Sequence, residues 1–164
     1  MKTRLVVMSD SHGDDDAVDS IILENPDADA YLHCGDLSSP ENYHPELVLV
    51  KGNNDYFSNA PYERVLHFGG IKIYMCHSHK LYGYPARKAL VRKAKEYGCA
   101  LALYGHTHMY DDSEADGVRV LNPGSCWHNR DGREPSYAIV DIEDGEIKIQ
   151  RVVCFQGGPD RQQM

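Results

Sequence analysis

Short apolar runs closed by polar clusters dominate the first third of the chain. The runs cover residues 5–8, 30–33 and 47–50, a length typical of buried strands. Between the first two, residues 14–23 carry apolar side chains at helical spacing, and Asn25-Pro26 ends that pattern. Alternating strand and helix patterns predict α/β units, whose ligand-binding groups lie at the carboxyl ends of the strands.

The rest of the chain predicts more β-structure around one further helix. Residues 64–68 and 72–76 flank Gly69-Gly70, a tight hairpin signal. A helix is expected from Pro85 to Tyr97, with Gly98 just past its end. Further strands are expected over residues 100–104, 118–121, 137–142 and 147–153. The pattern predicts an α/β fold in which two mixed β-sheets pack as a sandwich flanked by helices.

Length, charge and hydropathy narrow the class of protein. The 164 residues suit a single domain, expected over 1–155, with a polar, flexible C-terminal tail over 156–164. No apolar run approaches the roughly 18 residues that cross a bilayer, so we expect a soluble, cytoplasmic protein without a membrane partner. A net charge of −8 disfavours long nucleic acids as partners. The densest basic segment, residues 87–95, has the spacing of a solvated helix face.

The five cysteines are widely spaced and contain no Cys-x-x-Cys pair. An odd number of isolated cysteines indicates neither a disulfide framework nor a cysteine-type zinc site. We expect all five to be structural.

Five polar clusters follow the apolar runs in order. They are Asp10-Ser11-His12, Gly35-Asp36, Gly52-Asn53-Asn54-Asp55, His77-Ser78-His79 and Gly105-His106-Thr107-His108. Taken singly, most are as well explained by ordinary turns, since Asp, Asn and Gly favour turns. Together they bring carboxylate, amide and imidazole groups to one sheet edge, more groups than one cation needs. Such a set suits two divalent cations with water completing the coordination.

These motifs resemble those of the calcineurin-like metallophosphoesterases, and more closely the small bacterial and archaeal phosphodiesterase branch of that superfamily. The resemblance covers nearly the whole chain, including the closing Asn122-Pro123-Gly124-Ser125. It implies an αββα architecture with a two-metal site. One metal would be held by Asp10, His12 and His108, the other by Asn53, His77 and His106, with Asp36 bridging both.

The implied activity is hydrolysis of a small phosphate ester, most simply a phosphodiester, by water activated between the two cations. Two carboxylates against two dications leave a surplus of about +2, which attracts phosphate. Nitrogen and oxygen ligands without thiolate favour manganese, with nickel, iron or zinc as alternatives. The expected catalytic residues are Asp36, Asn53, Asn54, Asp55 and His77.

Two positions depart from the family pattern. Many members carry Gly-Asn-His-Asp, whose histidine supports the transition state or protonates the leaving group, and Asn54 stands at that position here. We therefore hypothesise that good leaving groups are strongly preferred. Ser78 replaces a common glycine; if positive φ is needed there, serine costs about 1 kcal/mol or somewhat more. Alternatively, its hydroxyl contacts the phosphate.

Other residues near the motifs have a structural interpretation beside a functional one. Asp14–Asp16 could be further ligands, but carboxylates at a helix start complement its dipole, and we interpret them so. His33 either orients a ligand or is a satisfied buried histidine. His79 is expected to be a loop histidine rather than a substrate donor. Tyr82 and Tyr84 are interpreted as packing or interface residues rather than an aromatic lip.

Two rival functions remain open. A eukaryotic retromer subunit of similar fold works chiefly as a scaffold, so a metal-binding interaction scaffold is the main alternative. A single-metal hydrolase such as an amidohydrolase also gathers His and Asp at strand ends, but the amide ligand Asn53 disfavours it. Exposed strand edges leave a homodimer open.

Overall fold

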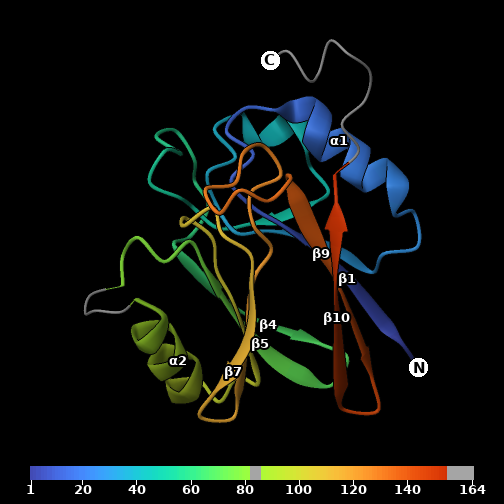
Figure 1. Ribbon diagram of the computed structural model, residues 1–164, viewed down its shortest axis with the longest axis vertical. Helices are drawn as coiled ribbons and strands as arrows, with labels where there is room; N and C mark the ends of the chain where they lie inside the picture. Colours follow the sequence, from blue (N-terminus) through green and yellow to red (C-terminus); the bar gives the residue numbers. More distant parts are fainter. Residues whose placement is uncertain (82–85, 155–164) are drawn as a thin grey trace.

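The computed structural model describes residues 1–81 and 86–154 and contains two five-stranded sheets with two α-helices (Figure 1). The first sheet has the order β10-β9-β1-β2-β3 and the second β4-β5-β6-β8-β7. The first sheet's strands are β1 (Thr3–Met8), β2 (Ala30–His33), β3 (Leu47–Leu49), β9 (Ser136–Glu143) and β10 (Glu146–Val153). The second sheet's are β4 (Glu63–Phe68), β5 (Ile71–Cys76), β6 (Leu101–Leu103), β7 (Asp111–Ala115) and β8 (Val118–Asn122).

Each sheet has three neighbouring parallel strands. In the first sheet β1, β2 and β3 run parallel, and in the second β5, β6 and β8 do. The antiparallel pairs lie beside them: β9 pairs with β1 and β10, β4 with β5, and β7 with β8. Carboxyl ends of parallel strands meet at one edge of a sheet, and the loops that follow them gather in the upper half of Figure 1.

The main core lies between the two sheets, and β1 shows how the sequence builds it. Leu5 and Val7 belong to the cluster between the sheets, whereas Val6 and Met8 belong to the cluster under α1 (Asp15–Glu24). Because successive side chains of a strand point to opposite faces, the continuous apolar run of β1 is buried on both sides.

The two helices cover the outer faces of the sheets. Ala17, Val18 and Ile21 of α1 pack on the first sheet. On the second sheet, α2 (Ala86–Glu96) buries Leu90 and Ala94 against β5, β6 and β8. A 3-10 turn, η1 (Glu41–Tyr43), precedes β3. The layers therefore run helix, sheet, sheet, helix, which confirms the predicted fold class.

The element predictions agree with the structure except on the second sheet's outer edge. The Gly69-Gly70 hairpin, the start of α1 after Asp14 and the exposed basic face of α2 are all observed. Strand β7, with the sequence DDSEA, was not predicted because it has no apolar alternation. Its outward position as an edge strand lets charged side chains remain partly exposed.

Some predictions fall outside the described residues. These are the roles of Tyr82 and Tyr84, the first turn at Pro85 and the tail over 156–164, so the domain boundaries stay predictions. No helix in the described ranges is long and apolar enough to span a bilayer. All five cysteines are buried, and none forms a disulfide in the part of the chain that the structure describes, which agrees with their structural interpretation.

Candidate metal centre

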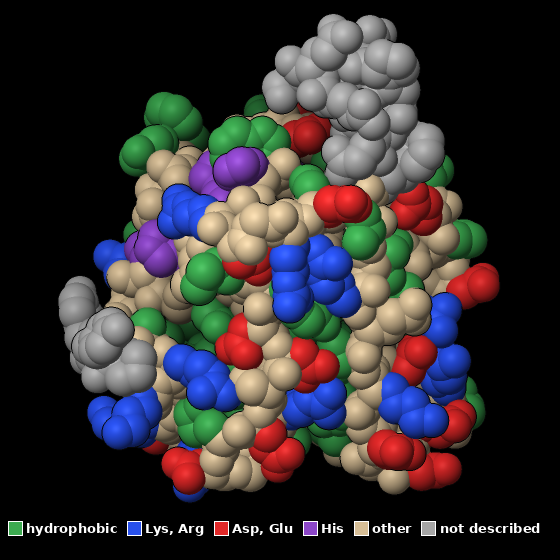
Figure 2. Space-filling model, in the orientation of Figure 1, with side chains coloured by type: hydrophobic (Ala, Val, Ile, Leu, Met, Phe, Trp, Pro, Cys, Tyr) green, Lys and Arg blue, Asp and Glu red, His purple; other side chains and the backbone are tan. Residues whose placement is uncertain are grey.

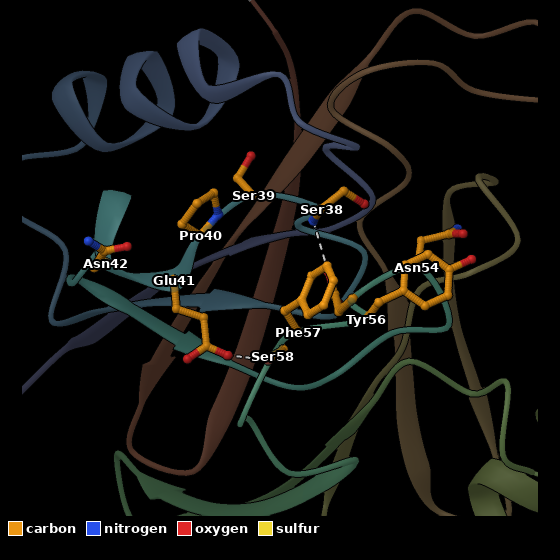
Figure 3. Close-up of a pocket in the computed structure, with 10 residues that line it drawn as sticks. Ser38, Ser39, Pro40, Glu41, Asn42, Asn54, Tyr56, Phe57 and Ser58 are labelled. Atoms are coloured by element: carbon orange, nitrogen blue, oxygen red, sulfur yellow. Dashed lines mark hydrogen bonds between the residues drawn. The ribbon is translucent and has the colours of Figure 1, made fainter.

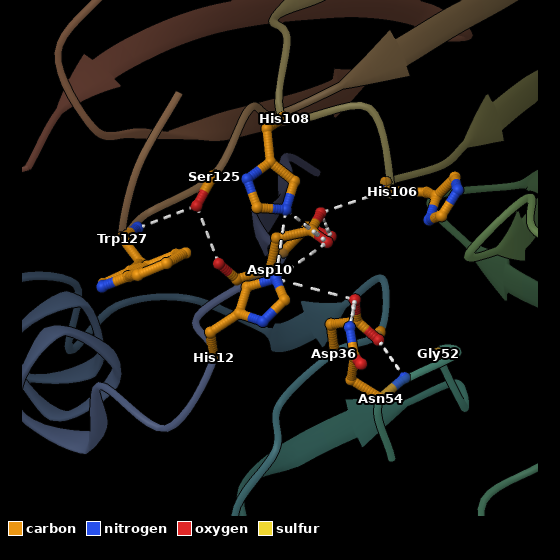
Figure 4. Close-up of polar contacts among 12 residues, drawn as sticks. Asp10, His12, Asp36, Gly52, Asn54, His106, His108, Ser125 and Trp127 are labelled. Carbon is orange, nitrogen blue, oxygen red and sulfur yellow. Dashed lines mark hydrogen bonds and ion pairs between the residues drawn. The ribbon is translucent and has the colours of Figure 1, made fainter. Parts of the chain in front are cut away.

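The five polar clusters converge at one edge of the two sheets. Asp10 and His12 follow β1, Asp36 follows β2, and Asn53 follows β3. His77 follows β5, whereas His106 and His108 follow β6. The seven side chains expected as metal ligands thus all come from five loops after parallel strands. Three of these loops belong to the first sheet and two to the second. Figure 4 shows several of them facing one another.

Six of these side chains form two groups with ligand atoms close enough to share an ion. Asp10, His12 and His108 make the first group, and Asp36, His77 and His106 the second; within each, the ligand atoms lie within 4.8 Å of one another. Asn53 joins the second group, because its Oδ1 lies 3.0 Å from His77 Nε2 and 3.1 Å from His106 Nδ1. The structure thus brings together the residues that the resemblance assigns to each metal, with Asp36 close to the second group.

Both carboxylates lie between the two groups. Asp36 Oδ2 is 3.2 Å from His77 Nε2 and 3.6 Å from His12 Nε2. Asp10 Oδ1 is 3.4 Å from His108 Nε2 and 3.8 Å from His77 Nε2. The position of Asp36 between His12 and His77 matches the bridging place expected for it.

Hydrogen bonds behind the site fix which nitrogen of two imidazoles faces it. His77 Nδ1 donates to the carbonyl of Cys34 at 2.8 Å, and His108 Nδ1 donates to the carbonyl of His128 at 2.8 Å. A neutral ring that donates from Nδ1 carries a lone pair on Nε2. Both Nε2 atoms therefore present lone pairs to the site, as metal-binding histidines with such partners do.

The arrangement of polar atoms fits cations. Asp10 Oδ1 is fully buried and accepts no hydrogen bond in the described part of the chain, although an unsatisfied buried carboxylate oxygen is costly. The Nε2 atoms of His12 and His108 face each other at 3.1 Å. Lone pairs gathered on buried oxygen and nitrogen atoms repel one another unless a positive charge lies between them, so this donor set fits a bound divalent metal.

The electrostatics of the carboxylates also favour positive charge. Burial would raise the pKa of Asp36, but His77 and the two donors of Asn54 outweigh it and hold this pKa well below its usual range. Burial likewise opposes ionisation of Asp10, yet His108, His77 and Ser9 lower its pKa overall. Both groups are therefore ionised at neutral pH.

The histidines divide into two electrostatic classes. Burial lowers the pKa of His12 and of His106, so both remain neutral ligands. Burial also opposes charge on His77, but Asp36 and Asp10 outweigh it and raise its pKa. The place beside His77 thus favours positive charge.

Backbone strain concentrates in these loops. Five of the seven expected ligands have positive φ, namely Asp10, His12, Asp36, His106 and His108. Non-glycine residues adopt this region uncommonly, and such strain clusters at functional sites. Ser78 also has a positive φ of 91°, which is the condition under which serine at that position is strained.

Two glycines allow the loops to approach one another. A Cβ at Gly52 would lie 2.2 Å from Asp36 Oδ1, and one at Gly105 would lie 2.1 Å from Ser9 Oγ and 2.8 Å from Asp10 Oδ2. Any side chain at either position would displace a carboxylate of the site. Both glycines lie inside the sequence motifs, although the motifs alone suggested no role for them.

Asn54 and Asp55 hold Asp36 rather than pointing freely into the site. Asn54 donates from its backbone N to Asp36 Oδ1 and from Nδ2 to Asp36 Oδ2, at 2.8 and 3.0 Å. Asp55 is buried, and its carboxylate accepts the backbone N–H groups of Asp36, Ser38 and Gly52 at 2.7–2.8 Å. The catalytic role expected for Asp55 thus becomes, in our interpretation, a positioning role.

Other histidines have clear surroundings. His33 is buried; its Nδ1 accepts Gly35 N–H at 3.1 Å, and its Nε2 lies 3.0 Å from Ser11 Oγ, so it is a satisfied histidine joining two ligand loops. His79 lies beside the site, with its ring 5.4 Å from that of His77. His44 lies between Asp15 and Asp19, with ring nitrogens 2.8 and 3.2 Å from their carboxylates.

Trp127 is a site residue that was not predicted from the sequence. Its ring lies 5.0 Å from that of His12, and nearly half of the residue, 49%, is exposed (Figure 4). A lone tryptophan in a polar loop belongs to no recognisable motif. It lies at the site because its loop packs over the end of β1.

Two sheets whose common edge gathers carboxylate, amide and imidazole groups are typical of metal-dependent enzymes of the α/β class. Comparison with known proteins identifies the family, because residues 3–145 match the calcineurin-like phosphoesterase superfamily domain. The chain belongs to this superfamily, and its small prokaryotic branch is confirmed by its relatives. Its class is thus that of a metal-dependent phosphoesterase.

Three relatives illustrate the range of similarity. YsnB, a probable metallophosphoesterase of Bacillus subtilis, is 34% identical over 89% of this chain and 88% of its own. A predicted phosphoesterase of Streptococcus pneumoniae has a TM-score of 0.86 and 31% identity, covering 96% of this chain and 95% of its own. Vacuolar protein sorting-associated protein 29 of Schizosaccharomyces pombe is 27% identical over 65% of this chain and 68% of its own.

Proposed function

We propose that this protein is a phosphodiesterase whose two ligand groups hold two divalent cations, most simply Mn²⁺. The observation that carries the proposal is Asp10 Oδ1, which is buried, accepts no hydrogen bond from the described residues and lies beside convergent imidazole nitrogens. Asp10, His12 and His108 would hold one cation, and Asn53, His77 and His106 would hold the other. Asp36 would contribute its carboxylate to both.

A bound pair of divalent cations supplies a water that is acidic enough to attack phosphorus near neutral pH and neutralises charge on the phosphoryl oxygens. The chain's own residues do the positioning. Asn54 orients the carboxylate of Asp36, and the carbonyls of Cys34 and His128 orient His77 and His108. Neutral imidazole and amide ligands leave the site a net positive charge that binds phosphate.

Preference for a diester is supported by open space beside the site. A hollow of about 580 Å³ is lined by Ser38, Pro40, Asn54, Tyr56 and Phe57 (Figure 3), among others. Asn54 connects this hollow to Asp36, so an organic group on a bound phosphate has room there. Figure 2 shows histidine side chains reaching the surface next to hydrophobic side chains.

Asn54 also bears on the leaving group. Its Nδ2 is committed to Asp36, and a carboxamide is no general acid at neutral pH. The preference for good leaving groups therefore remains our prediction. A series of aryl phosphodiesters should show kcat/KM falling steeply as the leaving-group pKa rises, and a flat series would contradict it.

The scaffold alternative draws support from the likeness to vacuolar protein sorting-associated protein 29. The intact ligand set favours an enzyme, because a scaffold has no need for seven convergent metal-binding groups. A cytoplasmic location and a homodimer stay predictions.

The test is hydrolysis of bis(4-nitrophenyl) phosphate by metal-stripped protein before and after Mn²⁺ is added. Activity should return with the metal and be lost in His106→Ala. His67→Ala, which removes an exposed histidine of β4, is the matched control and should retain activity. Tight metal binding without turnover of any phosphate ester would favour the scaffold.

A further inference from the structure

Trp127 is held in a fixed relation to the metal-binding loops. Its backbone N–H donates to Ser125 Oγ at 3.0 Å, and Ser125 Oγ donates to the carbonyl of Asp10 at 2.7 Å. His128 N–H donates to the same hydroxyl at 2.9 Å. One buried hydroxyl therefore ties the tryptophan loop to the backbone of a proposed ligand, as Figure 4 shows.

The indole ring is packed against the site without being buried. Ring centroids lie 5.0 Å from His12 and 6.3 Å from His108, both in the first ligand group. Yet 49% of Trp127 remains accessible. Single exposed apolar residues are common, but this one combines an open aromatic surface, a rigid backbone and contact with a proposed metal ligand. That combination suits a preorganised surface for stacking.

The exposed surface of Trp127 and the hollow at Asn54 lie at opposite ends of one row of side chains. The row runs from Trp127 to His12, then to Asp36 at 3.6 Å and on to Asn54 at 3.0 Å. In Figure 4 Trp127 and Asn54 flank the carboxylates from the two sides. A phosphodiester held at the centre carries two organic groups, and each end of the row offers a surface for one of them.

We infer that Trp127 is a specificity-determining residue that stacks on a flat aromatic group of the substrate, either an aryl ring or a nucleobase. The inference rests on the proposed function, because it requires the phosphate to lie on the metal centre. Tryptophan provides a broad face that tolerates any flat ring. The substrate class is therefore phosphate esters that bear an aromatic or nucleoside group.

Binding of monophosphates tests this without turnover. Inorganic phosphate, ethyl phosphate, phenyl phosphate and thymidine 5′-phosphate are titrated into Mn²⁺-loaded protein by calorimetry. We expect the two ring-bearing ligands to bind about tenfold more tightly than ethyl phosphate, the scale of one base stacked on an aromatic side chain. Equal affinities for phenyl phosphate and thymidine 5′-phosphate would indicate that the site accepts any flat ring. A higher affinity for thymidine 5′-phosphate would indicate a preference for nucleosides.

Variants assign the effect to the indole. Trp127→Ala should lose the tenfold preference while binding inorganic phosphate as before, and Trp127→Phe should retain most of it. Tyr97→Ala removes another partly exposed aromatic side chain, one that contacts Tyr74 and Glu63, and should change neither. Melting temperatures check that each variant is folded.

A second measurement needs no variant. Trp127 is the single tryptophan of the chain, so its fluorescence should respond to the ring-bearing ligands more than to inorganic phosphate. If ligands with and without a ring bind equally well and the fluorescence does not change, the stacking role of Trp127 is wrong, whereas the proposed function stands. That result would favour a protein-docking role for the exposed aromatic side chains. Failure of all four ligands to bind would contradict the proposed function as well.

Discussion

Asn54 donates to both carboxylate oxygens of Asp36, from its backbone N at 2.8 Å and from its side chain at 3.0 Å. The residue that stands in place of the family's histidine thus contacts a proposed bridging ligand. Its backbone bond survives substitution, whereas its side-chain bond does not. The contribution of Asn54 can therefore be tested separately from that of the loop.

Removing this side chain should weaken catalysis without removing the metals. We expect Asn54→Ala to lower kcat by about 10- to 100-fold, the range typical of groups that orient metal ligands. Steady-state kinetics with bis(4-nitrophenyl) phosphate, together with the metal content, would measure this. Asn42→Ala, in an exposed residue lining the same hollow, is the control. Equal kcat in the two variants would show that the bond to Asp36 has no catalytic role.

Gly105 should tolerate no side chain, because its Cβ would fall on Ser9 Oγ and Asp10 Oδ2. We expect Gly105→Ala to reduce Mn²⁺ affinity by about tenfold or more as Asp10 is displaced. Gly132→Ala serves as control, since its Cβ meets nothing within 4 Å although φ is +78°. That control should lose about 1–2 kcal/mol of stability through backbone strain but keep its metal affinity. Unchanged Mn²⁺ binding in Gly105→Ala would refute the close packing at this loop.

Ser78 offers the opposite case, in which glycine should be better. With φ at 91° and only a long bond of 3.5 Å from its hydroxyl to the carbonyl of Gly105, serine is strained and gains little. Ser78→Gly should raise the free energy of unfolding by up to about 1 kcal/mol in urea denaturation. Ser39→Gly, at a residue without positive φ, should be neutral or destabilising. A loss of stability in Ser78→Gly would mean that its hydroxyl matters more than its backbone.

The sequence predicted the buried strands of the fold better than the strand at the edge of the second sheet. The buried strand β1 was predicted because a continuous apolar run ending in Asp10 has few other interpretations. Strand β7 could not be predicted, since its pairing with β8 is long-range and its charged residues carry no period. The residues proposed as metal ligands came from ordered motifs and the family resemblance that those motifs carry, and the structure places their side chains close together.

Contacts across loops account for what the sequence could not predict. The bond between Asn54 and Asp36, the ring of Trp127 against His12, and the pairing of His44 with α1 all join residues from different clusters. Each side chain alone was compatible with an ordinary loop position. The roles of these side chains depend on distances between loops, and no local sequence pattern encodes those distances.

His33 should make metal-free protein sensitive to acid. Burial is the main cause that lowers its pKa from 6.5 to about 4, so the folded state keeps it neutral while the unfolded state takes up a proton. Stability from this group is present above pH 6.5 and is lost as the pH falls toward 4. In that window the unfolding free energy of wild type should fall more steeply than that of His33→Asn, by up to about 1.4 kcal/mol per pH unit. Parallel pH profiles from urea denaturation would contradict the prediction.

The central claim, two cations on two ligand groups, is tested most directly by counting metal ions. Metal-stripped protein is titrated with Mn²⁺ by calorimetry at neutral pH, and the stoichiometry is compared among wild type, His108→Ala and His106→Ala. Two ions per wild-type chain, with one high-affinity ion lost in each variant, is the predicted result. A single ion per chain, or none, would contradict the dinuclear site.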